Sequence, residues 1–158
     1  MNRWRTDTAI LVLRVASGLI FIPHGISKVF GSGGVATFAQ GLPSYGIPTA
    51  LGYVAAYSEL IGGILLILGL LTRIDAALLG ATMFVAAFIV QLPDAVRDPD
   101  AAGRNKVFAA IRGVELPLSV LAAMIALLLL GGGRFSLDAL VFRKADVGRA
   151  SARPDSAG

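Results

Sequence analysis

The sequence predicts an all-α integral membrane protein in which four apolar helices form a bundle, with a short interfacial helix near the C-terminus. Of its 158 residues, 56% are hydrophobic and only 15% are charged, whereas about a quarter are charged in soluble globular domains. A membrane-spanning helix needs roughly 20 apolar residues. Four stretches qualify, at about residues 8–30, 50–71, 74–92 and 107–130. Residues 1–144 are therefore expected to form one transmembrane domain.

The first span carries a face that is both polar and narrow. Five residues follow the alternating four- and three-residue spacing of one helical face: Arg14, Gly18, Phe21, Gly25 and Lys28. His24 lies on the flank of this face. Because glycine lets a neighbouring backbone approach closely, we expect the face to point into the bundle. The uncharged connection that follows, residues 31–49, is expected to lie in the outer membrane interface.

The second span places a carboxyl group among small residues. Glu59 shares a helical face with Gly62 and Gly63, which follow it by three and four residues. Small residues around an acid indicate that it is buried between helices. Tyr53 and Tyr57, four residues apart, add a stripe of phenols to the same span.

The last two connections and the fourth span complete the predicted order. The polar loop 93–105 is typical of a solvated connection. In the fourth span, Arg112 and Glu115 are three residues apart and can bridge along one helix. Ser136 then suits the N-cap of a short helix lying along the inner membrane surface. Residues 145–158 are small and polar, and we expect them to form a disordered cytoplasmic tail.

Lysine and arginine are unequally divided between the two sides of the predicted bundle. The two ends of the chain and the loop between the second and third spans hold most of them, and the other side holds Lys28, Arg97, Arg104 and Lys106. By the positive-inside rule, both termini are expected in the cytoplasm. This orientation accounts for the net charge of +4, so no nucleic acid partner is expected.

Ionisable residues inside the spans are the candidates for a functional site, because a charge at mid-bilayer costs ~2.5–3.5 kcal/mol on insertion scales. The helical rise places five of them in the outer half of the bundle: His24, Lys28, Glu59, Arg112 and Glu115. The predicted catalytic pair, which would exchange protons, is His24 with Glu59. The predicted ligand-binding residues are Lys28, Tyr57, Arg112 and Glu115.

The other residues singled out by the pattern are interpreted as structural. Close helix packing is expected at Gly18, Gly25, Gly62 and Gly63. Arg14 lies in the inner half of the bundle, and we expect its side chain to extend to the head groups of the inner leaflet. The charged residues have a second interpretation, as ion pairs that hold the helices together, above all Arg112 with Glu115.

The counts of two residue types restrict the redox chemistry that this chain can host. The chain has no cysteine and a single histidine. It can therefore form no disulfide or iron–sulfur cluster, and no haem held by two of its own histidines. No metal site and no covalently bound cofactor is predicted, so electrons would pass through a quinone or a cofactor of a partner.

Three groups of residues, in this order, resemble the DoxX family of small four-span bacterial membrane proteins. The first runs from Arg14 to Lys28, the second from Glu59 to Arg73, and the third comprises Glu115 with the segment Gly131 to Asp138. The resemblance implies a four-helix membrane bundle associated with oxidoreductase systems. Members of the family are described as subunits of a thiosulfate:quinone oxidoreductase and as membrane anchors of complexes that handle oxidative and thiol stress.

Three functions remain open on these grounds. The first is a DoxX-like membrane subunit of an oxidoreductase system, itself non-catalytic, which binds a quinone or anchors a soluble redox enzyme. The second is a proton-coupled carrier or binder of a small solute, which would act as a homo-oligomer because four spans are few for a transporter. The third is a membrane scaffold that recruits an enzyme through its basic C-terminal segment.

Overall fold

The structure is a computed structural model that describes residues 3–97 and 106–141. Within these ranges the chain contains helices and no strand, which confirms the all-α class. The α-helices are α1 (Arg3–Phe30), α2 (Gly34–Gly41), α3 (Thr49–Leu68), α4 (Thr72–Val85), α5 (Leu92–Arg97) and α6 (Lys106–Leu130). A short 3₁₀ helix, Leu42–Tyr45, follows α2, and a π-helix, Ala86–Gln91, joins α4 to α5.

Four helical segments are long and apolar enough to cross a membrane, as the sequence predicts. They are Arg3–Phe30, Thr49–Leu68, Thr72–Arg97 and Ala110–Leu130. The third runs five residues past the predicted end of its span, into the segment expected to be a loop. Pro93 does not end the helical run, because it stands in the first turn of α5, directly after the π-helical turn.

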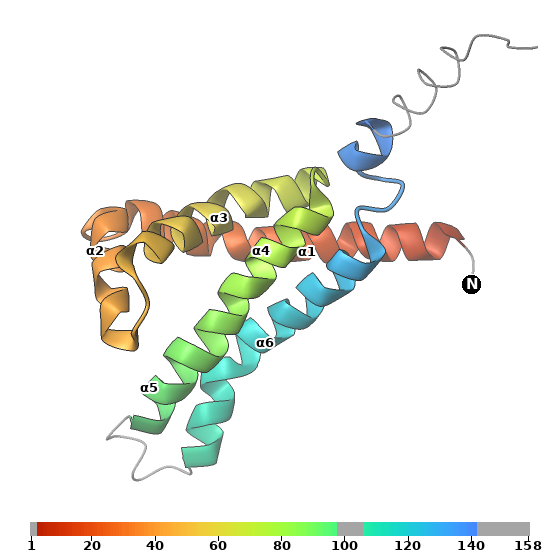
Figure 1. Cartoon of the computed structure of the whole chain (residues 1–158). Coiled ribbons are helices and arrows are strands. Elements are labelled where there is room, and N and C mark those ends of the chain that lie inside the picture. The colour runs from red at the N-terminus through yellow and green to blue at the C-terminus, as the bar shows by residue number, and fades with distance from the viewer. Residues whose placement is uncertain (1–2, 98–105, 142–158) are drawn as a thin grey trace, which may run out of the picture.

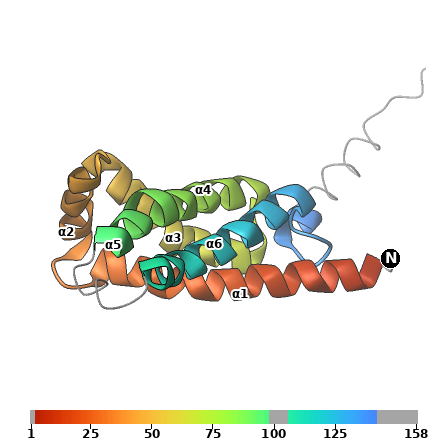
Figure 2. The ribbon, with the colours of Figure 1, turned by 90° about the horizontal axis from the view of Figure 1, so that it is seen from below.

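The four spans are arranged as two pairs that cross each other. Helix α1 lies along α3, and α4 lies along α6 (Figures 1 and 2). The α1–α3 contact is built on glycine: a Cβ at Gly18 would lie 2.5 Å from the carbonyl oxygen of Gly63, and one at Gly25 would lie 2.6 Å from Leu60 Cα. Only glycine leaves room for backbones this close.

The apolar core lies where the two pairs meet. Its members come from all four spans: Ile10, Phe21, Leu66, Ala76, Leu79, Val120, Met124 and Leu127. Large apolar side chains on the outer surface of the helices are exposed. In a membrane protein this exposed surface faces lipid, so the polar residues inside the bundle are the unusual feature.

The segment after α6 folds back onto the bundle. Gly131 leaves the helix with φ 75°, and Trp4 packs edge-on against Phe135 with ring centroids 5.4 Å apart. Ser136 Oγ accepts a hydrogen bond from Ala139 N at 3.1 Å, as expected of an N-cap. Residues 137–141 are helical. The expected tail, residues 145–158, lies outside the described residues.

Candidate functional site

An ion pair inside the bundle joins α1 to α3. Glu59, midway along α3, is 1% exposed, and both of its carboxylate oxygens accept hydrogen bonds of 2.5 Å from Lys28 Nζ. Lys28 is in the last turn of α1 and its side chain is 23% exposed, with Nζ 5.0 Å from the centre of the Phe38 ring on α2. The pair therefore connects the interior of the bundle to the surface beneath α2.

The structure does not bring His24 to this pair. His24 is exposed on α1, whereas Glu59 is buried and already bound by Lys28. The reason is the close approach at Gly25, which faces the backbone of Leu60. His24 is about 100° around the helix from Gly25, so its short side chain points away from α3.

Arg112 and Glu115 also lie away from the predicted cluster. Both are exposed on α6, which pairs with α4 rather than with α3. Within the described part of the chain, Lys28 and Glu59 form an ion pair, whereas Arg112 and Glu115 do not. Gly113, between them, packs against Ala95 of α5 and leaves its neighbours on the outer surface. The predicted convergence of five ionisable residues is thus reduced to two.

A groove of about 450 Å³ runs along α3 and α4. Tyr53 and Tyr57 line it from α3 and remain 37% and 44% exposed, and Ser58, Gly62, Asp75 and Leu78 are among its other residues. Tyr57, a predicted ligand-binding residue, therefore belongs to this groove. Lys28 and Glu59 are not among its lining residues.

Asp75 is the residue that the sequence interpretation missed. It is 5% exposed, and within the described residues its Oδ2 has no hydrogen-bond partner. Gly62 makes room for the carboxyl, because a Cβ at Gly62 would overlap Asp75 Oδ1. The sequence does signal it, because an acidic residue stands one position inside the predicted third span. It was overlooked because it stands at the edge of that span.

Arg14 is fully buried, which corrects the expectation that it reaches toward lipid head groups. Its Nη2 donates a hydrogen bond of 2.6 Å to the carbonyl oxygen of Phe135, and Asp138 attracts it electrostatically. The segment after α6 covers the N-terminal half of α1 and supplies both groups. Arg14 is therefore held inside the protein by this one hydrogen bond, and its Nε and Nη1 are buried with no partner among the described residues.

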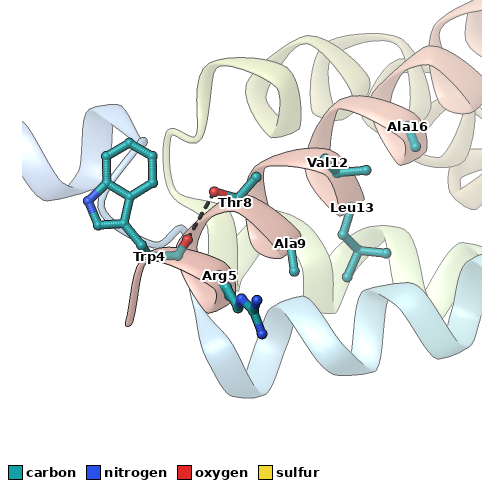
Figure 3. A pocket seen from close by; sticks show the side chains of 7 residues that line it. All are labelled: Trp4, Arg5, Thr8, Ala9, Val12, Leu13 and Ala16. Atoms are coloured by element: carbon teal, nitrogen blue, oxygen red, sulfur yellow. Dashed lines mark hydrogen bonds between the residues drawn. The ribbon is translucent and has the colours of Figure 1, made fainter. Parts of the chain in front are cut away.

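Two other polar features carry no comparable chemistry. Near the start of α5, the Tyr45 hydroxyl donates to Asp94 Oδ2 at 2.6 Å, and this hydrogen bond raises the pKa of Tyr45. At the N-terminal end of α1, an open groove of about 590 Å³ runs from Trp4 to Ala16 (Figure 3). Its one charged residue is Arg5, and the Thr8 hydroxyl is already bonded to the Trp4 carbonyl at 2.9 Å. No group of three potential metal ligands occurs in the described ranges.

Similar proteins cover most of this chain. A sequence profile of the DoxX family matches residues 9–92, which include the ion pair and the groove. "Putative oxidoreductase CatD" of Bacillus subtilis (strain 168) is 36% identical over 92% of this chain and 96% of its own length. A Mycobacterium tuberculosis protein named as an uncharacterized membrane protein, Rv3486, is 30% identical over 87% of this chain and 83% of its own length.

A third relative carries a location in its name. The inner membrane protein YqjF of Escherichia coli (strain K12) is 26% identical over 87% of this chain and 95% of its own length. No solved structure matches the chain significantly.

Proposed function

The chain belongs to the DoxX family of membrane proteins, and from this premise we propose that it is the membrane subunit of an oxidoreductase system and binds a quinone in the bilayer. The subunit supplies the quinone site and a proton route, and electrons come from a soluble redox enzyme that docks on it. Both termini face the cytoplasm, and the membrane is the bacterial inner membrane.

The observation that carries the proposal is the Lys28–Glu59 pair inside an apolar bundle. Charged residues in membrane spans are costly and commonly mark proton or ion pathways. Reduction of a quinone to a hydroquinone takes two electrons and two protons. The partner supplies the electrons, and the partly exposed Lys28 with the buried Glu59 provides a route for a proton between the surface and the bundle interior.

The similarity to CatD supports a redox system as the setting, because that protein carries the name "Putative oxidoreductase CatD" and matches nearly the whole chain. The sequence itself lacks the cysteines and paired histidines that would let this chain carry electrons on a cluster or a haem. A diffusible quinone, bound from the bilayer, fits both facts.

The first test is whether quinone travels with the protein. The protein is purified in mild detergent, and its organic extract is analysed by liquid chromatography with mass spectrometry. We expect quinone in near-stoichiometric amounts, and saturable binding of added decyl-benzoquinone where the native quinone is lost on extraction. If neither is observed for a folded wild-type protein, quinone binding is wrong, and pH-dependent solute uptake into proteoliposomes then becomes the function to test.

Glu59→Gln is expected to keep quinone binding and to lose proton exchange. Redox-induced infrared difference spectra of the quinone-loaded protein should show carboxylic acid signals in the wild type, and the signal that belongs to Glu59 should be missing in Glu59→Gln. His24→Ala should keep this signal, because His24 is exposed and does not contact the pair. A signal that survives Glu59→Gln and disappears in His24→Ala would contradict the assignment.

A further inference from the structure

The groove along α3 and α4 contains an acceptor that the protein leaves unpaired. Asp75 Oδ2 is buried and has no hydrogen-bond partner among the described residues. The atoms closest to a Cβ placed at Gly62 are Asp75 Oδ1 and the methyl groups of Leu79. A buried acceptor without a partner destabilises the folded protein, because it has lost water and gained nothing in exchange. A hydrogen-bond donor that enters the groove would remove this cost.

The position of the groove restricts where such a donor comes from. Asp75 is in the first turn of α4, about 5 Å along the helix axis from its first residue. Tyr53 and Tyr57, which line the same groove, are exposed on a membrane-spanning helix. The opening therefore faces lipid, and the occupant enters from the bilayer.

The lining determines the chemistry of the occupant. Apart from Asp75, it offers apolar side chains, two phenol rings and Ser58, whose hydroxyl is already bonded to the Ala55 carbonyl at 3.0 Å. A phospholipid head group would place its phosphate beside a carboxyl, which is unfavourable. A flat apolar ring with a hydroxyl donor fits both the tyrosines and the free oxygen.

We infer that this groove, here called the Asp75 groove, is the quinone site and that it binds the hydroquinone more tightly than the quinone. The inference rests on the proposed function. A hydroquinone donates its O–H to Asp75, whereas a quinone carries only acceptors and leaves the carboxyl unpaired. Tyr57 packs against the ring and its phenol can donate to the ring oxygen.

Asp75→Asn is expected to weaken binding of decyl-hydroquinone about tenfold, because a donor takes the place of one oxygen that could accept the hydroquinone O–H. The amide is nearly the same size as the carboxyl but presents an N–H₂ donor in place of one acceptor. Binding of decyl-benzoquinone should be unchanged or tighter, because the amide N–H₂ can donate to a quinone carbonyl. The preference for the reduced form then falls by at least the factor lost in hydroquinone affinity, so the potential of the bound couple moves down by about 30 mV per tenfold change.

Two further variants show whether a change in affinity is specific to the Asp75 groove. Asp94→Asn makes the same change in the same helical run, at an exposed position outside the groove, and should leave both affinities unchanged. Tyr57→Phe keeps the ring and removes the hydroxyl, so it should weaken both forms modestly. Thermal unfolding in detergent shows whether each variant is folded.

The outcomes separate the two proposals. If the wild type binds quinone and Asp75→Asn keeps both affinities and the preference for the reduced form, the Asp75 groove is not the site, although quinone binding stands. If the folded wild type binds neither form, the proposed function fails. A preference for hydroquinone that is lost in Asp75→Asn and kept in Asp94→Asn supports the inference.

Discussion

Replacement of Gly25 by valine should prevent α1 from packing on α3 and lower the free energy of unfolding by about 3 kcal/mol or more. Overpacking of a core usually costs about 1–3 kcal/mol when side chains can move aside. Here the added Cβ would lie 2.6 Å from Leu60 Cα and closer still to its backbone nitrogen. A helix backbone cannot rotate away as a side chain can, so the two helices must separate.

The measurement is unfolding of the purified protein in mixed micelles, followed by circular dichroism. Gly41→Ala is the matched control, because no atom lies within 4 Å of a Cβ placed there and its φ of −74° suits alanine. That variant should be neutral or slightly stabilising. A Gly25→Val protein as stable as the wild type would contradict the close α1–α3 contact.

This contact is the part of the site that the sequence predicted best. Glycine spacing along one face is a local, periodic signal, and it placed Gly18, Gly25 and Gly63 on the faces that meet. The burial of Glu59 follows from the same face. The four spans follow from composition alone, since a bilayer selects for length and apolarity.

His24 shows where helical periodicity fails. Lys28 is about 60° around the helix from Gly25 and His24 about 100°. A residue at either angle can lie on the flank of an inward face, so spacing alone does not show which of the two side chains contacts α3. The length of the side chain decides: Lys28 reaches back to Glu59, whereas His24 remains exposed.

Asp75 and Arg14 were misjudged because their surroundings come from distant parts of the chain. Asp75 is accommodated by Gly62 of another helix, and Arg14 bonds to Phe135, 121 residues away. Counting depth along a single span places both near a membrane edge, where a charge needs no partner. The burial of such residues depends on tertiary contacts that no local pattern contains.

The second large effect is expected at Asp138, which holds the start of α4. Its carboxylate accepts hydrogen bonds from the backbone N–H groups of Leu71 and Thr72 at 2.7 and 2.9 Å, and it attracts the buried Arg14. Loss of a helix N-cap costs about 0.5–2 kcal/mol, and the loss of the charge that attracts the buried Arg14, with which Asp138 forms no ion pair in the described ranges, adds to this cost. Asp138→Ala should therefore destabilise the protein by about 2 kcal/mol or more.

A double-mutant cycle distinguishes capping from charge compensation. Arg14→Met removes the buried guanidinium, so the Asp138→Ala change should then cost only the cap, and the two effects together should be smaller than their sum. Additive effects would show that Asp138 acts on α4 alone. Asp94→Ala, at an exposed carboxyl that bonds Tyr45, is the control and should cost no more than about 1 kcal/mol.

Asp138→Ala should also weaken binding of hydroquinone in the Asp75 groove. Asp75 follows Thr72 by three residues in the first turn of α4, and its backbone N–H donates to Leu71 O at 3.0 Å. When Asp138 no longer caps this turn, the Asp75 carboxyl loses its fixed position beside Gly62. Asp138→Asn, which keeps one acceptor, should retain more hydroquinone affinity than Asp138→Ala. Equal affinities in both variants would show that the C-terminal segment stabilises the bundle without positioning the site.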